Sequence, residues 1–286
     1  MEKLIDKTPN RLIFIRHGIR GISDIPTTGP CCVPLYNYQH ELSLYGHIYS
    51  FLLGKYIKEK IGKATLVYPD NSTERTIATA IAFAKGNDVC QVKYPVNKDQ
   101  YFEDTHQITQ SDITYSRFKL EEENQNIHTI ANEIKKCLPC VILDQSTTID
   151  DTGKISGLLA QLDVLSQVPS FSKLSKTCIK FNCDKQLVQS AFTIKQQVSY
   201  SQSIIDELGS KLLGGINTLI HDEKLSVLVG HDDKNIYILG EKMGKTFHAP
   251  GYAPGYIPPN SGFVFTLKKI IFASISFIFV IVEYFI

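Results

Sequence analysis

The chain has 286 residues, of which 43% are hydrophobic, so it is long and apolar enough to bury a large core in one big domain or two smaller ones. Its 30 lysines and arginines nearly balance its 29 aspartates and glutamates, and the net charge is +1. A chain this close to neutral has no overall field that would recruit nucleic acid or an anionic membrane surface. Any attraction for anions therefore has to come from arginines that the fold gathers locally.

The first predicted element is a short buried strand over residues 11–16, because four consecutive apolar residues lead directly into a polar cluster. That cluster holds Arg16, His17 and Arg20 beyond the carboxyl end of the strand, where open α/β sheets place their ligands. Gly18 would let the backbone approach a ligand closely, and two guanidiniums could fork onto one tetrahedral anion. Taken alone, a loop histidine between two solvated arginines explains the pattern equally well.

Two helices and a strand are predicted next. Apolar residues recur at helical spacing over residues 43–60, with Ser43 as the N-cap. A short strand over residues 65–68 follows, and Arg75 then stands at the start of a second helix. An arginine near a helix N-terminus suits an anion through its own charge and through the exposed amides. The alternative is a surface arginine paired with Glu74.

The character of the sequence changes after a predicted third strand over residues 90–95. Residues 101–193 are polar and rich in helical patterns, which indicates an inserted and largely α-helical segment. A helix over residues 193–213 returns the chain to the core, and Gly214 and Gly215 are predicted to break it.

A second polar cluster follows a near-continuous apolar strand over residues 225–229, of the type buried in parallel sheets. This strand leads into Gly230, His231 and Asp232. The arrangement repeats that of the first strand, since both strands end in a glycine and a histidine. The two ends would be neighbours if both strands are central in the sheet.

The seven cysteines do not indicate a metal site. Cys137 and Cys140 have the spacing of a redox motif or half a zinc site, but no second pair stands at metal-ligand distance. The odd count leaves at least one thiol free or paired with another chain, which weakly disfavours a fully oxidised secreted protein.

The two ends of the chain differ. Residues 1–10 are charged and lack the apolar stretch of a signal peptide, so no export signal is predicted. Residues 270–286 are apolar except for three positions, yet they are slightly short for a spanning helix of ~20 residues. Three interpretations of this tail stay open: a closing strand of the core, a membrane anchor, and an amphipathic interfacial segment.

Four motifs, in family order from residue 12 to about residue 240, resemble the histidine acid phosphatases, branch two of the histidine phosphatase superfamily, and among them the bacterial glucose-1-phosphatases and phytases. Residues 16–20 resemble the family's Arg-His-Gly-x-Arg motif, and residues 230–232 resemble its Gly-His-Asp motif. Between them, residues 41–46 resemble the Leu-Thr-x-x-Gly segment. Residues 70–80 resemble the Arg-Thr segment, which contributes a further pocket arginine.

The resemblance implies an α/β fold, a three-layer sandwich with a mainly parallel central sheet like that of the phosphoglycerate mutases, plus an inserted and mostly α-helical cap. The catalytic core would then be discontinuous, over residues 1–100 and 194–267. Residues 101–193 would form the cap, and residues 268–286 the hydrophobic tail.

The resemblance also implies hydrolysis of phosphate monoesters, such as sugar or inositol phosphates, with no cofactor and no metal. His17 would take the phosphoryl group as a phosphohistidine, and Asp232 would protonate the leaving group. An acid must hold its proton, so an acidic pH optimum is expected. The phosphate pocket would be formed by Arg16, Arg20, Arg75 and His231.

The sequence and the resemblance also lead to expectations about partners and location. A small phosphate monoester is the expected ligand, nucleic acid is not expected, and residues 270–286 offer a membrane contact. The resemblance implies a periplasmic or secreted protein, which the absence of a signal peptide opposes. A cytoplasmic or membrane-tethered location therefore stays open, as does the oligomeric state.

Two positions depart from the family pattern. Ile22 stands where many relatives have proline, and the family's His-Asp-Thr/Ser-Asn becomes residues 231–235, His-Asp-Asp-Lys-Asn, with one extra residue and one extra acid. The insertion could shift Asn235 and the next helix by one position, and the neighbouring carboxyls could couple their pKa values. A second function therefore competes with hydrolysis: a decayed phosphatase that binds phosphorylated ligands without turnover.

Overall fold

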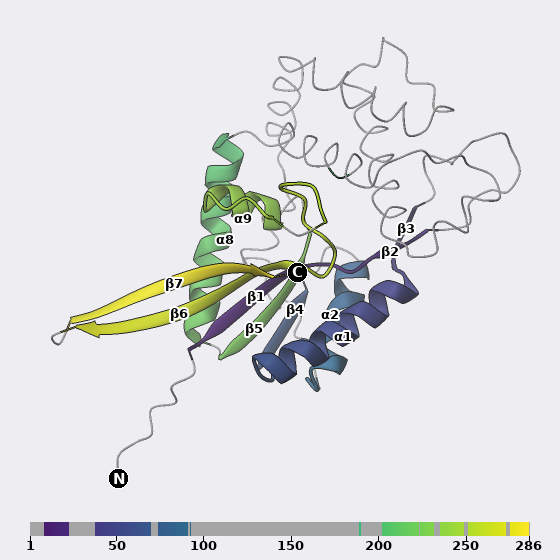
Figure 1. The fold of residues 1–286 in the computed structure, drawn as a ribbon, viewed down its shortest axis with the longest axis horizontal. Coiled ribbons are helices and arrows are strands. Elements are labelled where there is room, and N and C mark those ends of the chain that lie inside the picture. Colours follow the sequence, from purple (N-terminus) through teal and green to yellow (C-terminus); the bar gives the residue numbers. More distant parts are fainter. Residues whose placement is uncertain are drawn as a thin grey trace, which may run out of the picture.

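A five-stranded sheet organises the computed structural model, which describes residues 9–22, 38–69, 74–90, 92, 189, 202–222, 224–231, 235–248, 251–272 and 275–285. The strand order is β4-β5-β1-β6-β7 (Figure 1). Three strands are parallel: β1 (Arg11–Arg16), β4 (Leu66–Pro69) and β5 (Leu225–Gly230). Two are antiparallel additions: β6 (Gly262–Phe272) and β7 (Ile275–Phe285). A small separate sheet pairs β2 (Arg20–Ile22) with β3 (Tyr38–Leu42).

The strands predicted over residues 11–16 and 225–229 are neighbours, as expected. Residues 12–15 of β1 are fully buried, and every residue of β5 is buried. Strands with partners on both sides and helices on both faces need this near-continuous apolar sequence. The parallel register pairs Arg16 with Gly230, so the two strands end side by side.

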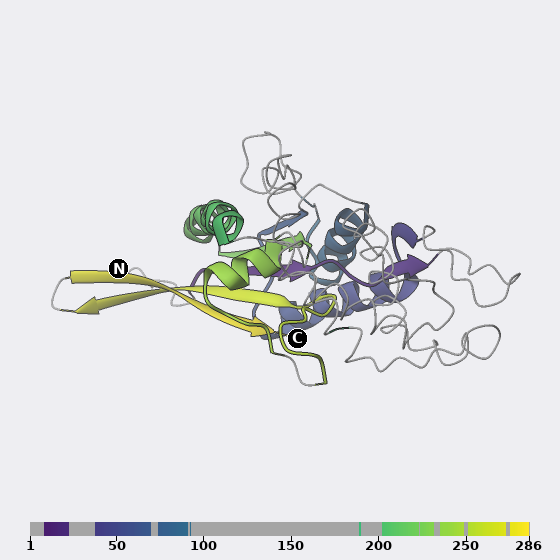
Figure 2. The ribbon, with the colours of Figure 1, turned by 90° about the horizontal axis from the view of Figure 1, so that it is seen from above.

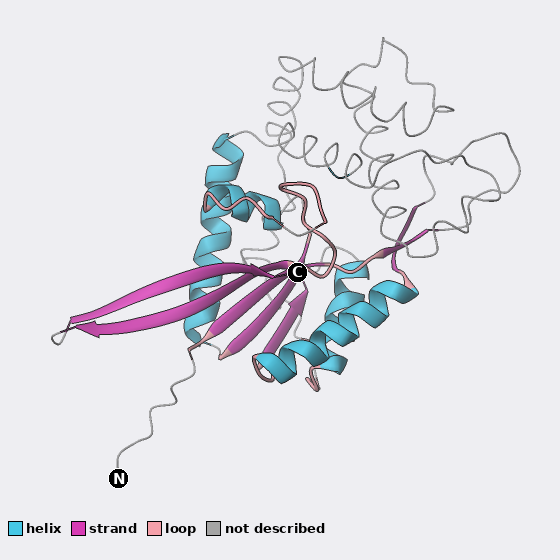
Figure 3. Cartoon of the chain, viewed as in Figure 1, coloured by secondary structure: helices cyan, strands magenta, loops and turns pink. Residues whose placement is uncertain are grey.

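Helices cover both faces of the sheet (Figure 3). Alternate residues of a strand point to opposite faces. Leu12 and Phe14 accordingly join a core cluster with α8 (Gln202–Asp222) and α9 (Tyr237–Lys242). Ile13 and Ile15 join another with α1 (Leu44–Lys60) and α2 (Glu74–Gly86). The chain is therefore a mixed α/β protein whose sheet has parallel pairing from β4 through β5 to β1 and antiparallel pairing from β1 through β6 to β7.

The first two helices begin where the sequence predicts and pack closely together. Ser43 caps α1, because its hydroxyl oxygen accepts a hydrogen bond from the Gly46 amide at 3.0 Å. A β-carbon added at Gly54 would lie 2.1 Å from the Phe83 carbonyl oxygen of α2. Glycine is thus required where the two helix backbones meet.

One predicted feature differs in the structure. Gly214 and Gly215 do not break the helix, since α8 continues to Asp222. Leu212, Ile216 and Ile220 are all buried against the sheet, and this packing outweighs a helix penalty of ~1 kcal/mol per glycine.

Most of the third predicted strand lies outside the described residues. Of residues 90–95 the structure describes only Cys90 and Val92, and neither of them is in a strand. Within the described residues β4 pairs with β5, which lies more than 150 positions later in the sequence.

The apolar tail is a strand in the structure, which agrees with one of its three interpretations. β7 pairs with β6 along its whole length, and Figure 2 shows this hairpin extending beyond the rest of the sheet. Among the described helices, none combines the length and hydrophobicity needed to cross a membrane. The predicted cap lies outside the described residues apart from Gln189, and so do Cys137 and Cys140.

Candidate active site

Two histidines meet where β1 and β5 end. The His17 amide donates a hydrogen bond to the Gly230 carbonyl at 2.9 Å, which continues the parallel ladder one residue past the strand. The rings of His17 and His231 lie 5.1 Å apart between centroids and cross at 70°. Both side chains are buried. The structure therefore brings together two predicted site residues that are 214 positions apart in the sequence.

The hydrogen bonds of His17 identify which ring nitrogen carries the proton. Nδ1 lies 2.7 Å from the Gly18 carbonyl oxygen, which can only accept, so Nδ1 donates. Nε2 then holds a lone pair, and it accepts a hydrogen bond from Arg75 Nε at 3.1 Å. Burial lowers the pKa of His17 well below its usual value, and the nearby cations Arg75, Arg16 and Arg20 lower it further. His17 consequently stays neutral at pH values where an ordinary histidine begins to bind a proton.

The loop after His17 is held by a residue that the sequence analysis did not identify. The Gly18 amide donates a hydrogen bond to the Thr79 hydroxyl oxygen at 2.9 Å. The Gly18 carbonyl accepts from His17, so both polar groups of Gly18 are used. Thr79 lies on α2, fully buried and one helical turn after Arg75. That spacing of four residues is the signal that could have identified it.

Arg75 links the two histidines. It lies in the first turn of α2 and is only 9% exposed. Nε donates to His17, and Nη2 lies 2.8 Å from His231 Nε2. A guanidinium has no acceptor, so His231 Nε2 must accept in this contact. Glu74, the alternative partner, is exposed on the neighbouring position.

Arg16 is anchored by the loop that precedes β6. Its Nη1 donates to the Ile257 carbonyl at 2.5 Å and to the Tyr256 hydroxyl at 3.3 Å. The guanidinium carbon also lies 5.6 Å from the centroid of the Tyr256 ring, within range of a cation–π interaction. Arg20 begins β2 and is 9% exposed. Tyr256 was not predicted, because no motif or periodicity connects it to Arg16.

A wide backbone hydrogen bond joins the two described residues that flank the end of the second motif, His231 and Ile236. The Ile236 amide donates to the His231 carbonyl at 3.1 Å, a π-type bond that spans five residues. Turns of this kind absorb a single additional residue and are frequent at functional sites. The side chain of Asn235 still reaches back, since its Oδ1 accepts from the His231 amide at 3.1 Å. Asp232, the predicted proton donor, lies outside the described residues.

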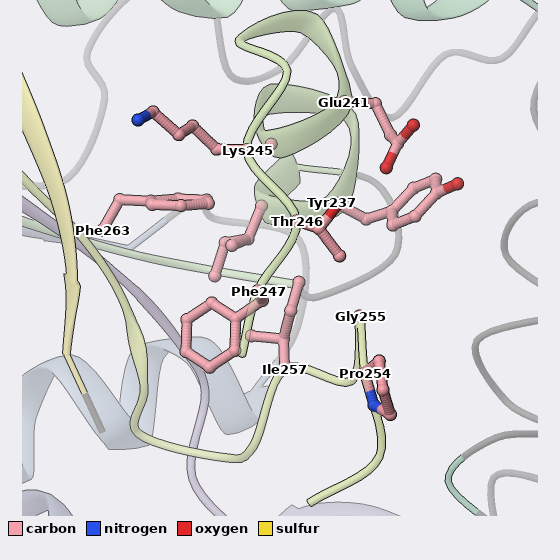
Figure 4. Close-up of a pocket in the computed structure, with 11 residues that line it drawn as sticks. Tyr237, Glu241, Lys245, Thr246, Phe247, Pro254, Gly255, Ile257 and Phe263 are labelled. Carbon is pink, nitrogen blue, oxygen red and sulfur yellow. The ribbon is translucent and has the colours of Figure 1, made fainter. Parts of the chain in front are cut away.

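A small hollow of about 130 Å³ lies between α9 and the loop that leads to β6 (Figure 4). Phe247, Ile257 and Phe263 provide apolar walls, and Tyr237 and Glu241 come from α9. Burial, with a smaller effect of Glu241, raises the pKa of Tyr237, so this phenol stays protonated. Neither histidine and none of the three arginines lines the hollow. It is therefore separate from the histidine cluster, although the Ile257 carbonyl supports Arg16.

The described cluster is suited to an anion. Arg16, Arg20 and Arg75 are all at least nine-tenths buried, and all three act electrostatically on His17. Guanidiniums removed from water interact strongly with phosphate-like oxygens, because each presents several donors in a fixed plane. The neutral Nε2 of His17 lies among them. The geometry thus brings three cationic side chains close to a ring nitrogen that carries a lone pair.

The chain matches no protein-family model, and it matches no curated protein. It is similar to solved structures. A Klebsiella sp. phytase is 16% identical with a TM-score of 0.64, over 96% of this chain and 82% of that one. A Citrobacter braakii phytase is 16% identical with a TM-score of 0.62, over 97% and 85%. A Hafnia alvei phytase in complex with myo-inositol hexakis sulphate is 16% identical with a TM-score of 0.59, over 91% and 80%.

These likenesses define the class of fold. The chain is an α/β protein with the fold of the phytases, which are histidine acid phosphatases. At 16% identity the likeness concerns the fold alone, and the resemblance carried by the four motifs is in agreement with it.

Proposed function

We propose that the protein is a phosphomonoesterase of the histidine acid phosphatase type, and that it hydrolyses phosphate monoesters such as sugar or inositol phosphates. The observation that carries this proposal is the state of His17: its Nε2 is unprotonated and accepts from buried Arg75, and two more buried arginines, Arg16 and Arg20, act electrostatically on the ring. The phytase-like fold supports the same conclusion.

Substrate binding frees the nucleophile. In the structure Arg75 donates to Nε2 of His17, the atom that has to attack phosphorus. Phosphate oxygens carry negative charge and are stronger acceptors than a neutral imidazole nitrogen. A bound monoester therefore draws the Arg75 guanidinium to its oxygens and leaves the lone pair available. Arg16 and Arg20 then spread the charge that develops on the oxygens in the transition state.

The reaction proceeds by double displacement. Nε2 of His17 forms a bond to phosphorus as the ester P–O bond breaks, and the leaving oxygen takes a proton from Asp232. The Nδ1–H bond to the Gly18 carbonyl keeps the ring aimed and stabilises the positive charge that the ring acquires. Water then attacks the phosphohistidine and gives a proton to Asp232. Inorganic phosphate leaves, and His17 is restored.

The pH dependence of the rate follows from His17 and Asp232. The lowered pKa of His17 keeps the nucleophile neutral in acid. Asp232 has to be protonated to act as an acid, which favours low pH. We expect the rate to peak in acid and to fall as pH rises toward neutrality.

Release of inorganic phosphate from p-nitrophenyl phosphate and from a sugar phosphate, between about pH 4 and about pH 8, tests the proposal. His17→Ala should lose at least ~10²-fold in rate on both substrates. Asp232→Asn should lose more on the sugar phosphate, because a sugar alkoxide needs a proton and nitrophenolate does not. Quenching the wild type in alkali during turnover should trap phosphate on His17, because the P–N bond of a phosphohistidine is stable in base and hydrolyses in acid.

The matched control is His47→Ala, since His47 is an exposed histidine on α1 and should leave the rate unchanged. A folded, phosphate-binding wild type that releases no phosphate from either substrate would refute the proposal.

A further inference from the structure

The first helix carries its large apolar side chains on the outside. Five of them recur at helical spacing along one face and are between 38% and 55% exposed. We call this face the α1 stripe, and it consists of Tyr45, Ile48, Tyr49, Leu52 and Tyr56. Leu44, at 74%, and Phe51, at 44%, extend it on one side.

The inner face of α1 explains why the stripe points outward. The buried positions of the helix are Gly46, Ser50, Gly54 and Ile57, three of which are small. They let α1 approach α2 until the backbones touch at Gly54 and Phe83. Small residues therefore make the contact with the core, and the bulky residues are left on the opposite face. A helix that is apolar on both faces is normally covered on both.

The exposed apolar area of the α1 stripe and its two flanking residues is similar in size to one side of a protein interface. At roughly 200 Å² for a complete large side chain, the seven exposed fractions amount to on the order of 700 Å². The largest apolar patch of an ordinary monomer covers about 300–600 Å². A stable complex buries about 800 Å² on each partner. The stripe and its two flanking residues are therefore close to what one half of a dimer requires.

The order of residues along the stripe is self-complementary. If a second α1 runs antiparallel across a two-fold axis between Ser50 and Phe51, Tyr45 lies opposite Tyr56 and Tyr49 lies opposite Leu52. A two-fold interface needs this reciprocity. If residue i of one copy contacts residue j of the other, then residue j of the first copy also contacts residue i of the second. Residues 44–54 contain no lysine, arginine, aspartate or glutamate, so the centre of such a pairing has no charge to desolvate. Charged side chains begin at Lys55, toward the rim.

We propose that two copies of this chain associate through antiparallel contact of their α1 helices. The surface lies on the far side of α1 from α2 and does not include the histidine cluster. The inference is therefore independent of the phosphatase proposal, and each of the two can fail without the other.

Sedimentation analysis of the full chain over a range of micromolar concentrations tests the proposal. The wild type should sediment as a dimer. Tyr49→Lys and Leu52→Glu each place a charge at the centre of the interface and should weaken dimerisation by at least ~10²-fold. An equimolar mixture of the two variants should dimerise again, because the introduced ammonium group of one copy then faces the introduced carboxylate of the other, while the second Tyr49–Leu52 pair is native.

Glu207→Lys and Lys211→Glu are the matched controls. Their side chains are 66% and 41% exposed on α8, which covers the opposite face of the sheet from α1, so these changes should leave the dimer intact. Circular dichroism of every variant establishes that it is folded. A monomeric wild type refutes the proposal, and so does a mixture of Tyr49→Lys and Leu52→Glu that stays monomeric while both are folded. Binding of a monomeric wild type to phospholipid vesicles would likewise overturn it in favour of a membrane surface.

Discussion

Gly18 shows how much of the site depends on single hydrogen bonds. Its carbonyl fixes the ring of His17, and its amide is fixed in turn by Thr79. A β-carbon at this position would lie 2.9 Å from the Leu42 side chain and 3.1 Å from the Gly46 carbonyl oxygen. The orientation of the His17 ring is thus transmitted from α2 through one backbone peptide.

The substitution Thr79→Val tests this transmission. Valine has the shape of threonine but cannot accept from the Gly18 amide, which would be left buried without its partner. We expect a loss of about 1–3 kcal/mol in the free energy of unfolding and a fall in kcat of about 10-fold with little change in KM. Urea denaturation and steady-state kinetics measure the two effects. Thr79→Ser keeps the hydroxyl and should recover most of kcat, and equal kcat values for the valine and wild-type enzymes would show that Thr79 has no positioning role.

At the scale of elements, α1 and α2 meet at two glycines. A β-carbon at Gly54 would lie 2.1 Å from the Phe83 carbonyl oxygen, and one at Gly86 would lie 2.0 Å from the Phe51 carbonyl oxygen. Each contact is with backbone, so rotation of a side chain cannot relieve it. This close approach also brings Thr79 and Arg75 of α2 to the ends of the strands.

Alanine substitutions at two helical glycines should therefore change the stability of the protein in opposite directions. Gly54→Ala should destabilise the protein by about 2 kcal/mol or more, because overpacking exceeds the ~1 kcal/mol that alanine contributes to helix stability. Gly214 is exposed on α8, so Gly214→Ala should stabilise the protein by up to ~1 kcal/mol. Thermal unfolding of both variants measures this. A Gly54→Ala variant as stable as the wild type would contradict the close packing of α1 against α2.

At the scale of the whole molecule, the buried neutral histidine links stability to pH. His17 in the folded protein stays neutral below its ordinary pKa of 6.5, whereas in the unfolded chain it binds a proton there. The unfolded state then binds more protons, so stability falls as pH falls below about 6.5 and is constant above it. One such proton corresponds to a slope of ~1.4 kcal/mol per pH unit.

We expect the free energy of unfolding in phosphate-free buffer to decrease between about pH 6.5 and about pH 5, before carboxylates begin to titrate. The slope of the unfolding free energy against pH should be smaller in His17→Asn than in the wild type, by the amount that corresponds to about one proton. Urea denaturation across this pH range measures both slopes. Identical slopes in the variant and the wild type would show that His17 is protonated in the folded state.

Local sequence patterns alone were enough to predict two central strands of the sheet and the first helix. The apolar runs that end in Arg16-His17 and in Gly230-His231 predicted two neighbouring buried strands, and Ser43 predicted the start of α1. These predictions succeeded because strand burial and helix capping depend on residues that are near one another in the sequence. The motifs also identified Arg16, Arg20, Arg75 and His231, which the structure places around His17.

Only the tertiary structure decided the remainder, because it depends on contacts between residues far apart in the chain. Packing of Ile216 and Ile220 against the sheet carries α8 through Gly214 and Gly215, against their local preference. The Tyr256 contact with Arg16 joins residues 240 positions apart, and the Arg75 contacts with His17 and His231 span 58 and 156 positions. The outward face of α1 likewise follows from the glycines that meet α2. Periodicity shows that a helix has an apolar face, but only its neighbours determine which face is buried.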